Sequence, residues 1–150
     1  MRPPRVLVIE ARFYDHIADG LLNGAVAALA AAGADHHRMT VPGILELPVA
    51  LRFALDSQAA GAVGYDGYVV LGCAIRGETD HYAHVCHEAM RGIQDLALAN
   101  SLAIGNGVLT VHNEKQALDR SEPERKNIGG LAARACLRMI ALKRELAAKA

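Results

Sequence analysis

The centre of the chain reads Gly67-Tyr68-Val69-Val70-Leu71-Gly72-Cys73-Ala74-Ile75-Arg76-Gly77-Glu78-Thr79-Asp80-His81-Tyr82, an apolar run that passes into a polar turn. The apolar part, residues 67–71, is typical of a strand covered on both faces in a parallel sheet. Residues from Tyr82 to Leu98 are expected to form the next helix. Ligands of open α/β sheets bind beyond the carboxyl ends of strands, where a following helix offers unpaired N–H groups to an anion. We therefore predict a functional site at this turn, formed by Arg76, Glu78, Thr79 and His81.

Strand-like and helix-like segments alternate outward from this stretch in both directions. The expected strands are Arg5–Ile9, Asp35–Val41, a third ending at Cys73, and Leu102–Thr110. The expected helices are Ile17–Ala32 with Gly33 just after its end, Glu46–Gln58, Tyr82–Leu98, Glu114–Asp119, and a last one from about Gly129. This alternation predicts an α/β fold, a three-layer αβα sandwich around a four-stranded parallel sheet with right-handed crossovers. We expect residues 1–150 to form one domain.

Apolar residues at three- and four-residue spacing define the buried face of each expected helix. In the second helix they are Leu47, Leu51, Ala54 and Leu55, and in the third Val85, Ala89, Ile93 and Leu96. In the last helix an apolar stripe is formed by Leu131, Ala135 and Met139.

The composition narrows the class of protein. Hydrophobic residues make up 52% of the chain, but aromatic residues only 4%, so the core must be built mainly from Ala, Val, Leu and Ile. Sixteen basic residues balance sixteen acidic ones, which removes the positive field that a nucleic-acid or anionic-membrane binder would use for capture. We therefore expect neither of these two partners.

Cysteine usage and hydropathy suggest a cellular location. The three cysteines, Cys73, Cys86 and Cys136, form no Cys-x-x-Cys pair and are expected to be reduced thiols. The first residues lead directly into a strand and show no signal-peptide core. No apolar run approaches the ~20 residues of a membrane span. We expect a soluble, cytoplasmic protein.

Histidines recur at residues 81, 84 and 87 with Cys86 among them, which raises the question of a metal site. Three-residue steps drift around a helix of 3.6 residues per turn, so His81 and His87 would diverge by roughly 120°. We therefore favour a single chemical role, for His81 as general acid or base, because histidine exchanges protons near neutral pH. The other interpretation is a helix-capping or surface histidine.

Other polar and aromatic residues at strand ends each allow two interpretations. Arg76 and Arg120 suit a phosphate or a surface ion pair, and the charged run 119–126 could be a solvated loop. Phe13 could stack on a planar ligand or cover the edge of the core. Glu46 could bind a ligand or complement the dipole of its helix. The sequence has no glycine-rich dinucleotide or ATP loop, so neither nucleotide is expected as a ligand.

Four segments together, in order, are similar to one family: the chain resembles lumazine synthase (6,7-dimethyl-8-ribityllumazine synthase). These segments are Ala11-Arg12-Phe13, the run from Val41 to Pro48, the run from Gly72 to Tyr82, and Gly107 to Thr110 followed by Glu114, Gln116, Ala117 and Arg120. The resemblance covers nearly the whole chain and implies a flavodoxin-like fold. It implies condensation of 5-amino-6-(D-ribitylamino)uracil with 3,4-dihydroxy-2-butanone 4-phosphate, with release of phosphate and water and with no cofactor.

The resemblance also implies roles for individual residues. His81 would transfer protons, Arg76 would support the site, and no metal would be bound. The pyrimidine and its ribityl chain would contact Phe13, Gly43, Ile44, Leu45, Glu46, Cys73, Ala74, Ile75 and Asn106. The phosphate would contact Gly77, Glu78, Thr79 and Arg120. Implied partners are copies of the same chain, in a homopentamer or a multiple of it with the active site between subunits, and riboflavin synthase.

The chain departs from the family pattern at four places, one of which is the run 121–124, Ser-Glu-Pro-Glu in place of a common Ala-Gly-Thr-Lys. Asn106 replaces a common aromatic residue, Tyr14 a frequent Asn, and Ile128 a usual lysine that has only Lys126 near it. These changes bear on substrate affinity and assembly size. They leave open a second hypothesis, a flavin- or lumazine-binding oligomeric scaffold with little catalytic activity.

Overall fold

Four parallel strands form the central sheet of the protein, whose computed structural model describes residues 2–150. The strands are β1 (Arg5–Ala11), β2 (Asp35–Val41), β3 (Gly67–Ile75) and β4 (Ile104–Val111). They lie in the order β2-β1-β3-β4, with both central strands paired in parallel on each side. This is the flavodoxin-like order over four strands. The predicted α/β sheet is confirmed.

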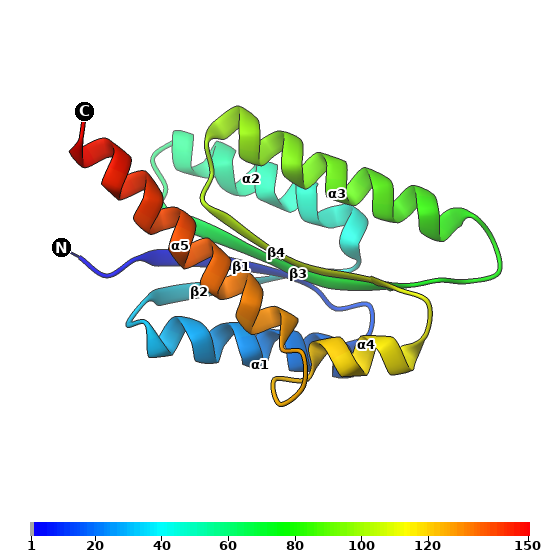
Figure 1. The fold of residues 1–150 in the computed structure, drawn as a ribbon. Helices are drawn as coiled ribbons and strands as arrows, with labels where there is room; N and C mark the ends of the chain where they lie inside the picture. Colours follow the sequence, from blue (N-terminus) through cyan, green and yellow to red (C-terminus); the bar gives the residue numbers. More distant parts are fainter. Residues whose placement is uncertain (1) are drawn as a thin grey trace.

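Helices cover both faces of the sheet and complete the three layers (Figure 1). One face carries α1 (Asp15–Ala31), α4 (Glu114–Ser121) and α5 (Ile128–Ala148), and the other α2 (Leu47–Ala59) and α3 (His81–Asn100). A 3₁₀ turn, η1 (Ile44–Glu46), leads into α2. None of the helices in residues 2–150 combines the length and apolarity required to cross a membrane.

The core consists of two layers of aliphatic side chains separated by the sheet. Val69 and Leu71 point from β3 toward α1 and α5, whereas Tyr68 and Val70 point toward α2 and α3. Strand β3 is therefore covered on both faces, as its unbroken apolar run predicts. The predicted faces of the second and third helices are confirmed, since Leu47, Leu51, Ala89 and Ile93 are buried and their partners pack against them.

Several element boundaries differ from the prediction. Strand β3 continues past Cys73, because Ala74 and Ile75 pair with Thr110 and Val111 of β4. Helix α1 begins at Asp15 instead of residue 17. Residues 44–46 form a separate turn before α2, which has its proline in the first turn. The predicted end of the first helix is confirmed, since Gly33 follows the C-cap with a φ of 69°.

Helix α5 faces the core with small residues instead of its large apolar ones. The stripe of Leu131, Ala135 and Met139 lies outward, with Leu131 49% and Met139 41% exposed. The buried residues are Gly129, Gly130, Ala132, Ala133, Cys136 and Ile140. A Cβ atom at Gly129 would overlap the carbonyl oxygen of Leu21 in α1. Small side chains thus let α5 lie directly against α1 and the sheet.

Candidate active site

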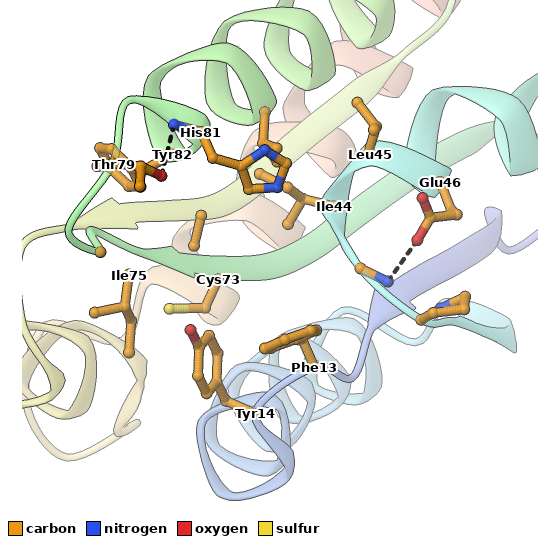
Figure 2. Close-up of a pocket in the computed structure, with 15 residues that line it drawn as sticks. Phe13, Tyr14, Ile44, Leu45, Glu46, Cys73, Ile75, Thr79, His81 and Tyr82 are labelled. Carbon is orange, nitrogen blue, oxygen red and sulfur yellow. Dashed lines mark hydrogen bonds between the residues drawn. The ribbon is translucent and has the colours of Figure 1, made fainter.

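A cavity of about 380 Å³ lies at the carboxyl ends of β1, β2 and β3, beside the start of α3 (Figure 2). Its volume is within the range of small-molecule sites. Four segments distant in sequence line it: Phe13 and Tyr14, Pro42 to Glu46, Cys73 to Ile75, and Gly77, Thr79, His81, Tyr82 and Val85. The position agrees with the predicted location of a ligand beyond the strand ends.

Phe13 and Tyr14 form the wall that follows β1. Phe13 is 71% exposed, and its ring meets that of Tyr14 edge to face with centroids 5.0 Å apart. Burial and the nearby Cys73 thiol raise the pKa of the Tyr14 phenol, and a backbone hydrogen bond with Ile75 partly opposes this. Tyr14 therefore ties the wall to the end of β3, while Phe13 presents an open aromatic surface.

The facing wall is the turn between β2 and α2. The backbone N–H of Gly43 donates to Oε1 of Glu46 over 3.0 Å, which closes the turn around one carboxylate oxygen (Figure 2). Ile44 is buried beneath this turn. A Cβ atom at Gly72 would lie 2.7 Å from Cγ2 of Ile44, so the glycine in β3 allows the turn to approach the sheet.

His81 is the first residue of α3, and its imidazole points into the cavity (Figure 2). Its backbone N–H donates to Oγ1 of Thr79 over 3.3 Å. His84, one turn later, is instead an exposed residue that lies 3.2 Å from the Asp80 carboxylate. Within residues 2–150 no three His, Cys, Asp or Glu side chains are grouped so that they could hold a metal ion. Of these two histidines only His81 lines the cavity.

The floor of the cavity carries no charge at neutral pH. Burial raises the pKa of the Cys73 thiol to about 12, and the neighbouring Cys86 adds to the rise. Burial also raises the pKa of the Tyr82 phenol, with Cys86 again contributing, against a hydrogen bond to Thr110 that lowers it. Because these groups stay neutral, a ligand that covers them does not have to remove a charge from water.

Four of the predicted site residues do not line this cavity in the single chain. Arg76 and Glu78 line a neighbouring hollow of about 380 Å³, whereas Gly77 and Thr79 belong to both hollows. Arg120 lies on α4 and donates to the carbonyl oxygen of Gln116 over 3.3 Å. Asn106 lies on the edge strand β4, where its Oδ1 accepts from the N–H of Val108 over 3.0 Å.

The charged run at residues 119–126 covers the end of α4 and the first part of the loop before α5, and its side chains form ion pairs. The Asp119 carboxylate lies 3.9 Å from Arg125 and 3.6 Å from Lys126. Arg125 also lies 3.0 Å from Glu122. The Asp119 carboxylate also lies 3.9 Å from the guanidinium of Arg120, so this ion pair is a long one.

Sequence reasoning did not assign Tyr14, Pro42, Tyr82 and Val85 to the site, although all four line the cavity. Tyr14 is adjacent to Phe13, and Pro42 to Gly43. Tyr82 and Val85 follow His81 by one and four residues, a spacing that places Val85 on the same helix face as His81. Adjacency and helical spacing were therefore the signals available for these residues.

The sequence is similar to known proteins of one family. A family model described as 6,7-dimethyl-8-ribityllumazine synthase matches residues 3–144. A 6,7-dimethyl-8-ribityllumazine synthase of Paramagnetospirillum magneticum is 65% identical over 144 residues, covering 95% of this chain and 96% of the relative. The 6,7-dimethyl-8-ribityllumazine synthase 1 of Rhizobium meliloti is 50% identical over 149 residues, covering 99% and 97%. That of Bartonella tribocorum is 52% identical over 143 residues, covering 95% and 92%. The chain therefore belongs to the 6,7-dimethyl-8-ribityllumazine synthase family.

Proposed function

We propose that the protein condenses 5-amino-6-(D-ribitylamino)uracil with 3,4-dihydroxy-2-butanone 4-phosphate to give 6,7-dimethyl-8-ribityllumazine in riboflavin biosynthesis. Family membership supports this reaction. The observation that carries the proposal is the His81 imidazole, which enters a cavity bounded by an exposed aromatic ring on one side and a helix N-terminus on the other. A flat heterocycle and an anion need these two kinds of surface.

The pyrimidine end of the cavity is assigned to Phe13 and the end of β3. The Phe13 ring is open for stacking, and Cys73, Ala74 and Ile75 line the uncharged floor beside it. Glu46 is assigned to the ribityl hydroxyls together with Gly43, Ile44 and Leu45. Its Oε1 is engaged by Gly43, which leaves Oε2 without a hydrogen-bond partner in residues 2–150. A carboxylate oxygen fixed in this way is a strong acceptor for hydroxyl groups.

The phosphate end is assigned to the turn before α3. Gly77 and Thr79 line the cavity there, and the first N–H groups of α3 favour an anion. Glu78 belongs to the same turn, and Arg76 supports it through a backbone hydrogen bond of 2.9 Å to Val111. Arg120 is assigned to the phosphate of a neighbouring subunit's substrate, and Asn106 to the pyrimidine side of that subunit's pocket.

The chemistry consists of three steps. The amine of the pyrimidine attacks the ketone and forms an imine with loss of water, phosphate is then eliminated, and ring closure releases a second water. The cavity would act mainly by holding both substrates in contact. His81 would move protons between nitrogen, carbon and departing oxygen, a contribution of roughly 10²–10⁴ in rate. The neutral Cys73, Tyr14 and Tyr82 groups would not compete for these protons near neutral pH.

We assign the active protein to a homopentamer or a multiple of it, located in the cytoplasm, with riboflavin synthase as a further partner. The exposure of Phe13 supports a cavity completed by another subunit. Exposed Met39 on β2 and Phe53 on α2 line a hollow beside the edge strand, and apolar surface of this kind commonly marks an interface. Sedimentation of the purified protein would measure the assembly.

The test is incubation of the purified protein with both substrates while lumazine absorbance is recorded. We expect a rate well above that of the spontaneous reaction. A rate equal to the spontaneous one would reject the enzyme. Tight riboflavin binding together with a background rate would instead support the scaffold hypothesis. The names of the relatives, which are all synthases, favour the enzyme.

A further inference from the structure

A carboxylate that the proposed chemistry does not use is buried next to the cavity. Glu10, in the last part of β1, has no exposed surface at all. Its Oε1 accepts from Nη1 of Arg12 over 2.6 Å, and its Oε2 accepts from Nε of Arg38 on β2. A buried charge is tolerated when it is paired and hydrogen-bonded, and here each carboxylate oxygen has its own arginine.

Arg12 connects this carboxylate to the start of α1. Its Nε donates to Oδ1 of Asp15 over 3.1 Å, and its Nη2 donates to the Asp15 carbonyl oxygen over 3.2 Å and to the Asp19 carboxylate. The guanidinium therefore bridges the end of β1 and the first two turns of α1. Partial burial lowers the pKa of Arg12, but the hydrogen bonds to Asp19 and Glu10 outweigh it and the pKa rises, so the cation is retained.

The bridged segment is the aromatic wall of the cavity. Only Arg12, Phe13 and Tyr14 separate β1 from α1. Tyr14 is the N-cap residue of α1, yet no side-chain hydrogen bond caps this helix. The start of α1 is instead fixed by Arg12, whose own N–H donates to the Val41 carbonyl oxygen over 3.0 Å.

We propose that Glu10 is a positioning residue, which acts through Arg12 to fix the place of Phe13 and Tyr14 at the substrate cavity. Glu10 does not line the cavity, so any effect on a ligand is indirect, and Arg12 is its contact next to Phe13. The kinetic consequence rests on the proposed function, because it concerns the pyrimidine that Phe13 would contact. The structural consequence, the place of the Phe13 ring, does not depend on it.

The chain offers a direct reporter for this role, because Phe13 and Phe53 are its only phenylalanines. Protein labelled with fluorophenylalanine gives one ¹⁹F resonance for each ring. Glu10→Gln removes the charge with little change in volume, and Arg12→Gln removes the bridge at a partly exposed position. We expect both variants to shift or broaden the Phe13 resonance and to leave that of Phe53, on α2, unchanged.

Arg38→Gln is the matched control, because it removes the second arginine of Glu10 while Arg12 keeps its contacts. The Phe13 resonance should stay in place in this variant. The proposal is upheld if folded Glu10→Gln moves the Phe13 resonance alone, as Arg12→Gln should. It is overturned if folded Glu10→Gln leaves Phe13 in place or moves both rings, even where Arg12→Gln moves Phe13. If Glu10→Gln does not fold, Arg12→Gln decides by the same two outcomes.

Kinetics give a second readout that a general loss of stability would not produce. In Glu10→Gln we expect kcat/KM for the pyrimidine to fall roughly 10- to 100-fold, as a small misplacement of a positioning surface does. The KM for the phosphorylated substrate should change less than about twofold. Equal losses for both substrates would contradict selective positioning. If the wild-type protein lacks condensation activity, the proposed function fails and the ¹⁹F measurement still decides the role of Glu10.

Discussion

The N–H of His81 and the hydroxyl of Thr79 form a 3.3 Å hydrogen bond at the first residue of α3. This contact joins the turn before α3 to His81, and both residues line the same cavity. The imidazole therefore points into the cavity to which we assign both substrates.

Replacement of His81 by alanine should lower kcat by roughly 10²-fold or more, with little change in either KM, because proton transfer is lost and binding is retained. Steady-state kinetics with lumazine absorbance measure this. His84→Ala is the control, since His84 lies on the same helix, is exposed and pairs with Asp80. A kcat within about threefold of wild type would remove His81 from the mechanism.

Replacement of Arg120 by alanine should raise the KM for the phosphorylated substrate about tenfold or more, since a charge-assisted hydrogen bond is lost. The KM for the pyrimidine and the sedimentation coefficient should be unchanged. Arg125→Ala removes a cation from the same charged turn and should have no such effect. Identical kinetics in both variants would show that the turn only faces solvent.

Raising the pH from 8 to 10 should lower the free energy of unfolding through the buried thiols. Burial raises the pKa of Cys73 and of Cys136 from 9.0 to about 12, so above pH 9 the folded chain keeps protons that the unfolded chain releases. The stabilisation is complete below pH 9 and is lost as the pH approaches 12.

Each thiol contributes up to about 1.4 kcal/mol per pH unit above pH 9. Urea unfolding at several pH values measures the slope. Cys136→Ala should make the slope shallower by up to about 1.4 kcal/mol per pH unit above pH 9, whatever its effect on stability at neutral pH. Parallel curves for the two proteins would contradict this origin of the pH dependence.

Gly129→Ala should destabilise the fold by about 2 kcal/mol or more, because the new methyl group would overlap the Leu21 carbonyl of α1. Chemical denaturation measures the loss. Gly64→Ala is the matched control, since its Cβ would meet only the flexible side chain of Gln58. Equal midpoints for the two variants would show that α1 and α5 can separate without cost.

The arrangement of strands and helices could be predicted from hydrophobic periodicity. Several errors concern the ends of strands, where pairing with other strands decides the boundary. Strand β3 runs two residues beyond Cys73 because β4 supplies partners for Ala74 and Ile75, and such pairing is invisible along one segment. The first strand was expected to end at Ile9, one residue before Glu10. Glu10 belongs to β1 because it pairs with Thr40 of β2 and Leu71 of β3, and its buried carboxylate is held by Arg12 and Arg38.

The structure brings predicted site residues together where neighbouring strands end. Phe13, Glu46, Cys73 and His81 line one cavity because parallel strands end on the same edge of the sheet. Arg120 and Asn106 stay predictions, because both were assigned to a pocket shared with another copy. The exposed stripe of α5 could not be foreseen from periodicity, since small residues that pack closely carry a weak hydrophobic signal.

The close packing of α5 against α1 and the sheet has a consequence for synthesis on the ribosome. Val69, Leu71 and Leu109 stay without their cover on the α5 side until residues 128–148 have emerged. At translation speeds of about 5–20 residues per second, this aliphatic surface is bare for at least a second or so. The nascent chain is therefore most prone to aggregation while α5 is being translated. We expect chaperones to bind it most during this interval.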